Sequence, residues 1–174
     1  LCSKIKAITL PDSLTKIEGL AFYKTQISEI TVPANVTTLC SYEGINNVSS
    51  KDYSAFFGMD YLEKVTFAEG MKAVPASALM NCNGVKEVVL PESVTFIGNT
   101  AIAHNANITE IYVPQGVTFI SEASFRSNPK VVLNVAEGSY AHKTALKYGL
   151  RVKVRPFIPS LVESGTCGAN ATWE

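Results

Sequence analysis

The stretch Val85-Lys-Glu-Val-Val-Leu-Pro-Glu-Ser-Val-Thr-Phe-Ile97 recurs along the chain with a period of 23 residues. The apolar residues that open four successive copies are Leu62, Val85, Ile108 and Val131. Self-similarity at such a period is typical of a solenoid, in which each repeat buries its apolar face only by stacking on its neighbours. The period therefore decides the architecture before any residue chemistry is considered.

Within each copy, numbered from Leu62 as position 1, the residues at positions 4 and 6 are apolar and the residue between them is exposed. This alternation predicts a short strand with one buried face. Position 7 is proline in most copies, and proline ends a strand because it has no N–H to donate. The strand pairs are Ile8/Leu10, Ile30/Val32, Val65/Phe67, Val88/Leu90 and Ile111/Val113.

A second apolar pair and then a small residue before a large one, as in Ala101-Ile102, follow each strand. We interpret the small–large stretch as a helical or 3₁₀ turn opposite the strand, with the large side chain in the core. Together these features predict a leucine-rich repeat solenoid, a right-handed superhelix of about five 23-residue coils.

The segment Ile5-Lys-Ala-Ile-Thr-Leu-Pro-Asp-Ser-Leu-Thr-Lys-Ile17 and the stretch quoted first resemble the BspA-type leucine-rich repeats of bacterial cell-surface proteins. The resemblance covers roughly residues 1–155. It departs from the pattern at Ala68, which stands at the proline position, and at Cys2 and Cys82, which alone place cysteine at position 21. The resemblance implies an adhesion-like module that lies outside the cell, on the bacterial surface.

The domain boundaries follow from where the pattern stops. Residues 1–155 form the expected solenoid, with a closing unit at 138–155. That unit holds a helix with Ser139 as its N-cap and Gly149 just past its end, then a strand from Leu150 to Val154. Residues 156–174 read as a linker and the start of a following module. Since Cys2 aligns with the tail of an earlier repeat, we expect further modules of the same chain at both ends.

One repeat, from Ile27 to Leu62, is 35 residues long and therefore holds 12 extra residues. The excess lies around Ser41 to Tyr53, and we assign the insertion to residues 42–52. Insertions in solenoids emerge as loops, often on the binding face. Tyr42, Lys51 and Tyr53 are accordingly candidate ligand contacts. The alternative is a tolerated surface insertion, because extra loop length costs little stability.

The exposed strand positions form a second candidate contact surface. Extended faces of this kind are what solenoids use to bind proteins and glycans, although a merely solvated face would also be polar. The candidate contacts are Thr66, Glu87, Val89, Glu110 and Tyr112.

Basic residues gather in the closing unit, within residues 138–162, where no acidic residue occurs. Such a cluster attracts an anionic polymer or an acidic partner surface; the alternative is a solvated end face. The candidate patch is Lys143, Lys147, Arg151, Lys153 and Arg155.

Composition excludes several classes of function. The 174-residue chain has a formal net charge of zero, which argues against nucleic-acid binding. No apolar run is long enough to insert into a membrane. The cysteine and histidine spacings match no metal site, and no cofactor motif occurs, so we expect neither metal nor cofactor.

Two arrangements superficially suggest an enzyme. Cys82 and His104 fall on neighbouring coils, and Glu87 and Glu110 are expected side by side on the sheet, at a spacing that suits a retaining glycosidase. Neither has a third orienting group or a deep pocket. The sequence therefore favours a non-enzymatic module that binds a protein or a glycan, with a structural spacer as the alternative.

Overall fold

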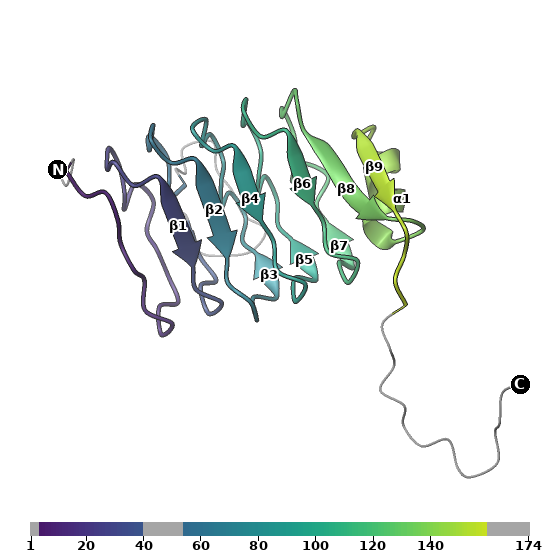
Figure 1. Cartoon of the computed structure of the whole chain (residues 1–174), viewed down its shortest axis with the longest axis horizontal. Helices are drawn as coiled ribbons and strands as arrows, with labels where there is room; N and C mark the ends of the chain where they lie inside the picture. The colour runs from purple at the N-terminus through teal and green to yellow at the C-terminus, as the bar shows by residue number, and fades with distance from the viewer. Residues whose placement is uncertain (1–3, 40–53, 160–174) are drawn as a thin grey trace, which may run out of the picture.

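The computed structural model describes residues 4–39 and 54–159. They form a β-solenoid of about four turns, each of roughly 23 residues, with one short helix at the C-terminal end (Figure 1). The sequence repeats 1 to 5 occupy residues 5–26, 27–61, 62–84, 85–107 and 108–130. The insertion at 42–52, the candidate contacts Tyr42, Lys51 and Tyr53, and the expected start of a further module lie outside the described residues.

The predicted strands form one long side of the solenoid and pair in parallel, in the orders β1-β2-β4 and β6-β8-β9. In β1, β2, β4 and β6 the position-4 side chain is buried and its neighbours are more exposed, as the alternation predicts. These strands are β1 (Glu29–Val32), β2 (Lys64–Phe67), β4 (Glu87–Val89), β6 (Glu110–Tyr112), β8 (Val132–Ala136) and β9 (Val152–Arg155).

The insertion does not disturb this pairing. Glu29 pairs with Lys64, 35 residues further on, whereas Lys64 pairs with Glu87 after the regular 23. The 12 extra residues therefore do not change the register of the strands on either side of them.

A second parallel sheet, which the sequence did not predict, lies on another side of the solenoid. Its order is β3-β5-β7, and it is built from the second apolar pair of repeats 3 to 5. The inward residue of each strand is buried in the hydrophobic core. The strands are β3 (Ala73–Val74), β5 (Phe96–Ile97) and β7 (Phe119–Ile120).

The expected helical or 3₁₀ turn on the third side is wrong. This turn side, residues 75–82, 98–105 and 121–128 in repeats 3 to 5, consists of turns. Met80 N–H donates within its own turn to Ser77 O at 3.2 Å, but Leu79 N–H donates sideways to Ala101 O of the next repeat at 2.7 Å. Because alternate N–H groups leave the turn in this way, a continuous helical bond pattern cannot form.

Backbone conformation supports the same alternation. Ser77 and Thr100 share one repeat position, and Asn81 and His104 share another; all four have positive φ, between 50° and 60°. Left-handed residues at fixed places reverse the chain and keep its alternate N–H groups pointing along the solenoid axis.

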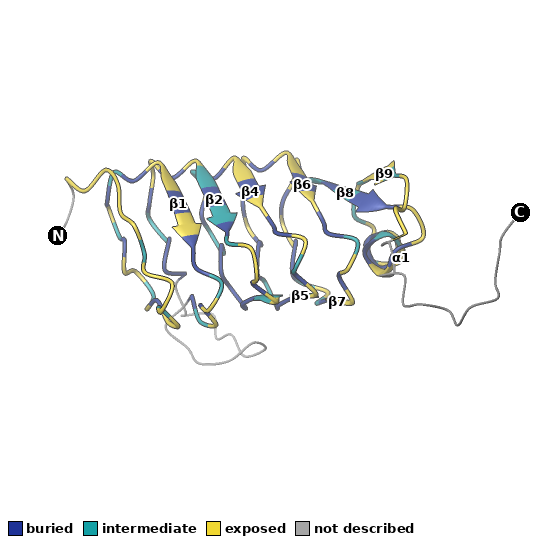
Figure 2. Cartoon of the chain, turned by 60° about the horizontal axis from the view of Figure 1, so that its bottom comes forward, coloured by how far each residue is buried: buried dark blue, intermediate teal, exposed yellow. Residues whose placement is uncertain are grey.

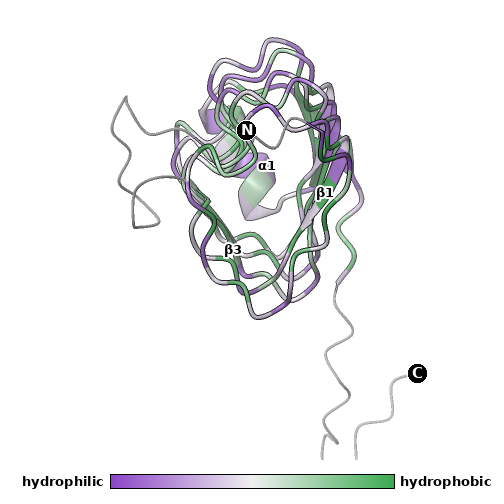
Figure 3. Ribbon diagram, turned by 90° about the vertical axis from the view of Figure 1, so that its left-hand side faces the viewer, coloured by the Kyte–Doolittle hydropathy of each residue, from purple (hydrophilic) through white to green (hydrophobic). Residues whose placement is uncertain are grey.

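The closing unit largely matches its prediction. Helix α1 (Tyr140–Lys147) begins after Ser139, whose hydroxyl accepts from His142 N–H, and Gly149 follows the helix with φ 66°. Strand β9 begins two residues later than expected. Helix α1 lies at the C-terminal end of the stacked coils (Figure 1), and the view along the axis shows it within their outline (Figure 3). Its Ala141 and Ala145 are buried.

The period fails at β8. Ile111 pairs with Leu133, only 22 residues later, so the run that opens at Val131 does not repeat the earlier register. The apolar residues of that run that face the core stand one position earlier than in the other repeats. Strand pairing follows these residues, because keeping the 23-residue register would turn them to the outer face.

The core runs the length of the solenoid between the two sheets and the turn side (Figure 2). Phe56, Phe67 and Phe125 are among the largest side chains that it buries completely. Repeat 1 differs, since residues 5–10 form no strand and Ile5 and Ile8 are 37% and 39% exposed. About four turns are thus formed, against the five expected.

Candidate functional site

Three of the predicted sheet-face contacts lie in one outward-facing row that runs from β2 and β4 to β6. Thr66 pairs with Val89 in the register of β2 and β4, and Tyr112 occupies the same position on β6. Val89 and Tyr112 are among the exposed large hydrophobic residues, at 36% and 40%. A row of this kind provides contact area, and Thr66 at one end of it also lines a hollow of about 430 Å³.

The two predicted glutamates are each held by a lysine. Glu87 accepts from Lys64 at 2.8 Å, and this hydrogen bond raises the pKa of Lys64. Glu110 accepts from Asn134 at 2.9 Å and from Lys153 at 3.3 Å, and these bonds, Asn134 first, hold the pKa of Glu110 below its ordinary value. The sheet pairing is also interrupted between β4 and β6, so Glu87 and Glu110 belong to separate three-stranded sheets.

Tyr112 is the centre of a compact cluster that joins the repeats to the closing unit. The guanidinium of Arg155 lies 4.1 Å from the centroid of the Tyr112 ring and donates to Val113 O at 2.9 Å. Asn134 pairs with Tyr112 on one side and with Lys153 on the other. We call Glu110, Tyr112, Asn134, Lys153 and Arg155 the Tyr112 cluster.

Opposing effects act on the pKa of Tyr112 within this cluster. Partial burial, and then a hydrogen bond with Glu92, raise the pKa of Tyr112, and the charge of Arg155 opposes them. Within the described residues, the buried side-chain polar atoms without a hydrogen-bond partner are Asn134 Oδ1 and Arg155 Nε, both in this cluster. Because buried polar atoms usually have a hydrogen-bond partner, these two atoms leave one acceptor and one donor of the cluster without a partner in the described residues.

The predicted basic patch is divided between two surfaces. Lys153 and Arg155 belong to the Tyr112 cluster, and Arg151 donates to Pro129 O. Lys143 and Lys147 are exposed on α1. The five basic residues are close in sequence, but those on β9 and those on α1 lie on different surfaces.

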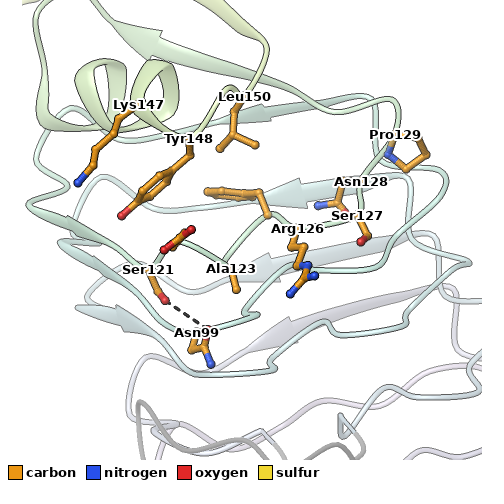
Figure 4. A pocket seen from close by; sticks show the side chains of 12 residues that line it. Asn99, Ser121, Ala123, Arg126, Ser127, Asn128, Pro129, Lys147, Tyr148 and Leu150 are labelled. Atoms are coloured by element: carbon orange, nitrogen blue, oxygen red, sulfur yellow. Dashed lines mark hydrogen bonds between the residues drawn. The ribbon is translucent and has the colours of Figure 1, made fainter.

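Sequence reasoning missed a groove between α1 and the turn side of repeat 5. It measures about 1230 Å³ and opens to solvent. Lys147, Tyr148 and Leu150 form one wall, and Ser121, Ala123 and Arg126 lie across from them (Figure 4). We call it the end groove. No motif signals it, because it exists where a shortened last repeat and a helix replace a further coil.

The two arrangements that suggested an enzyme acquire no catalytic geometry. Burial raises the pKa of the Cys82 thiol to about 12, and the thiol lies 3.7 Å from Ser54 Oγ. His104 is exposed on the turn side. A retaining glycosidase needs an acid with a raised pKa, whereas the pKa of Glu110 is lowered.

In the part of the chain that the structure describes, no group of three His, Cys, Asp or Glu side chains is placed to hold a metal ion. Over the same residues, no helix combines the length and the apolar character needed to cross a membrane.

Comparison with known proteins places the chain among repeat proteins. The family model of the BspA type leucine rich repeat region matches residues 2–132 in six copies. No curated protein matches the chain.

Two solved structures are similar in fold. One is a leucine rich cell surface protein from Faecalibacterium prausnitzii A2-165, with 17% identity and a TM-score of 0.48, covering 86% of this chain and 53% of that one. The other is a leucine-rich repeat protein from Bacteroides ovatus ATCC 8483, with 21% identity and a TM-score of 0.48, covering 84% and 47%. The chain spans about half the length of these two proteins. Because the six matched repeats account for most of its residues, the chain belongs to the BspA-type leucine-rich repeat family.

Proposed function

We propose that this chain is a non-enzymatic binding module that recognises a protein or a glycan through the Tyr112 cluster. The observation that carries the proposal is the exposed Tyr112 ring, held 4.1 Å from the Arg155 guanidinium. An amphipathic ring that its neighbour already fixes loses little conformational freedom on binding.

The surroundings of the ring support recognition of a polar ligand. Glu110 and Lys153 form an exposed ion pair beside it, and Asn134 joins the two strands. Exposed tyrosine and arginine side chains are the types that most often dominate binding energy at interfaces. Offered together, they suit a sugar ring or a mixed polar and apolar protein surface.

A structural spacer is the second candidate, and the ion pairs on the sheet face favour it. Glu87 is paired with Lys64, and Lys86 with Glu63, so much of the charge on β2 and β4 is neutralised locally. Exposed pairs of this kind keep a repeat array soluble without any ligand.

Location at the bacterial cell surface, outside the cell, is part of the same proposal. It rests on the likeness of the repeats to the BspA type and on the adhesion-like role that this likeness implies. Further modules at both ends of a longer chain remain a prediction of the sequence.

The test is binding of the purified chain to arrays of glycans and extracellular proteins, beside the variants Tyr112→Ala and Tyr61→Ala. Tyr61 is the matched control, since it is 59% exposed and lies outside the Tyr112 cluster. We expect Tyr112→Ala to lose the signal and Tyr61→Ala to keep it. Absence of binding to any array would leave the spacer, and equal binding by both variants would contradict the choice of surface.

A further inference from the structure

On the turn side, repeats 3 and 4 each present a row of N–H groups that the next repeat occupies, whereas in repeat 2 the equivalent N–H, that of Phe56, donates to Ser54 Oγ of its own turn. Between repeats 3 and 4, Ser77, Leu79 and Asn81 donate to the carbonyl groups of Asn99, Ala101 and Ala103, at 3.0, 2.7 and 3.2 Å. Between repeats 4 and 5, Ile102 and His104 donate to the carbonyl groups of Ser124 and Arg126, at 2.9 and 2.8 Å. The row thus binds the backbone of a peptide segment in which alternate carbonyls point the same way.

A side chain completes each of these contacts. The N–H of Cys82 donates to Asn105 Oδ1 at 2.9 Å, and the N–H of Asn105 donates to Asn128 Oδ1 at 2.7 Å. Each bound segment therefore supplies three features in sequence: a small residue, a large apolar residue and, three positions after the large one, an asparagine. The two segments are Ala101-Ile-Ala-His-Asn105 and Ser124-Phe-Arg-Ser-Asn128.

The row ends at repeat 5. The N–H groups of Ala123, Phe125, Ser127 and Asn128 stand at the same repeat positions, yet none has an acceptor within the described ranges. All four residues line the end groove. The carbonyl groups of the intervening residues Ser124 and Arg126 already accept from N–H groups of repeat 4. This edge of repeat 5 therefore offers N–H donors, while those carbonyl acceptors are occupied.

The walls of the end groove suit a peptide of the same pattern. Tyr148 and Leu150 give an apolar lining above Phe125, whose side chain is almost completely buried. The ammonium of Lys147 lies 5.6 Å from the centroid of the Tyr148 ring. Helix α1 contacts β7 of repeat 5 as well as β8 and β9. The groove lies between the C-terminal end of the helix and the turn side (Figure 4). A peptide main chain supplies carbonyl groups at every second residue, as repeats 4 and 5 do for the repeat before each of them. A saccharide has no such series of carbonyl groups.

We propose that the end groove is a peptide-binding site, in which a short segment of a partner protein adds a further rung to the turn side. Its carbonyl groups accept from Phe125 and Ser127, and an asparagine side chain of the segment accepts from Asn128. The site is separate from the Tyr112 cluster and does not depend on it. Addition of an extended peptide to an unpaired sheet edge is an established mode of recognition, and here a segment folded as a turn would pair with an unpaired edge of turns.

The test uses a fluorescent synthetic peptide with the sequence of residues 98–106, Gly-Asn-Thr-Ala-Ile-Ala-His-Asn-Ala, titrated against the 174-residue chain. We expect saturable binding below about 1 mM. The same peptide with leucine in place of the asparagine at 105 should bind about tenfold more weakly, because one acceptor is lost. Nuclear magnetic resonance should place the largest amide shifts at Phe125, Ser127 and Asn128.

A variant of the protein adds a second line of evidence. Ala123→Trp fills the end groove and should weaken peptide binding, while Ala106→Trp, at an exposed position outside the groove, should not. Thermal melting checks that both variants fold. If either variant does not fold, the comparison of the two peptides on the unaltered chain still tests the proposal. Tyr112→Ala should bind the peptide normally, which separates this proposal from the one above.

Three outcomes would overturn the proposal. The first is that the peptide shows no saturable binding. The second is that neither the substitution of leucine in the peptide nor Ala123→Trp in the protein weakens binding. The third is that the chain forms a dimer that protects the same amides in the absence of peptide. The last would assign the groove to a second copy.

Discussion

The backbone N–H of Asn105 donates to the side-chain oxygen of Asn128, one repeat further along, at 2.7 Å. Asn105 in turn accepts from the N–H of Cys82 and donates to the carbonyl groups of Leu79 and Ala103, at 2.9 and 3.1 Å. Both asparagines are buried. The amide side chain of one repeat thus satisfies the backbone of its neighbour, and successive repeats are tied together at this corner.

Asn105→Ala should destabilise the protein by about 3 kcal/mol, because it leaves the Cys82 N–H and the Leu79 carbonyl buried without partners. The exposed Asn107 makes one bond to Asn83 O at 2.8 Å and provides the matched control. Asn107→Ala should cost about 0.5 kcal/mol or less. Chemical denaturation of the two variants measures the difference, and equal losses would contradict the assigned role of Asn105.

Gly98 allows two repeats to approach closely. A Cβ at this position would lie 2.7 Å from Ala76 N and 3.0 Å from Val74 O, whereas at Gly116 the nearest atom is Glu92 O at 3.8 Å. Gly98→Ala should therefore cost about 1–3 kcal/mol, since backbone atoms must move. Gly116→Ala should leave the melting temperature nearly unchanged; a comparable loss at both sites would mean that spacing between repeats is not limiting.

Cys82 should be chemically inert in the folded protein. Burial raises the pKa of its thiol to about 12, so almost no thiolate forms at neutral pH. In a variant that carries Ser at the other three cysteines, a thiol reagent at pH 8 should react only after denaturant is added. Rapid reaction of the native variant would contradict the buried placement.

The same shift predicts a dependence of stability on pH. The thiol pKa is higher in the folded than in the unfolded chain, so its contribution is complete below pH 9 and is lost as the pH rises toward 12. Relative to Cys82→Ala, the free energy of unfolding should fall by about 1.4 kcal/mol per pH unit above pH 9. Parallel pH profiles for the two proteins would contradict the shift.

Arg155→Lys tests the packing around Tyr112. The planar guanidinium both stacks on the ring and reaches Val113 O, which a lysine cannot do together. We expect a loss of about 0.5–1 kcal/mol and weaker binding at the Tyr112 cluster. Arg126→Lys, at an exposed position on the turn side, is the control and should change neither.

The sequence predicted the solenoid because the strand and core positions recur at fixed spacing, and burial of those residues decides the fold. It also predicted α1, since Ser139 and Gly149 are strong local signals for the two ends of a helix. It failed on the turn side, where Ala101-Ile102 fits a helix locally but alternate N–H groups bond to the next repeat. Pairing between repeats is not visible in local composition.

The candidate surfaces were predicted less completely. Exposure of Val89 and Tyr112 followed from the strand alternation. Contact between Tyr112 and Arg155, 43 residues apart, depends on the 22-residue step into β8, which no period reveals. The Asn105–Asn128 pair had one signal, two asparagines 23 residues apart in adjacent repeats.

Residue-resolved amide hydrogen exchange tests the central claim, that repeats 3 and 4 use alternate N–H groups of their turn sides to hold the next repeat and that repeat 5 keeps its own row unpaired. Leu79, Asn81, Ile102 and His104 should exchange slowly, because their N–H groups are bonded between repeats. Phe125 and Ser127, at the equivalent positions of repeat 5, should exchange much faster. Equal protection of the two sets, or fast exchange at Ile102 and His104, would contradict the claim.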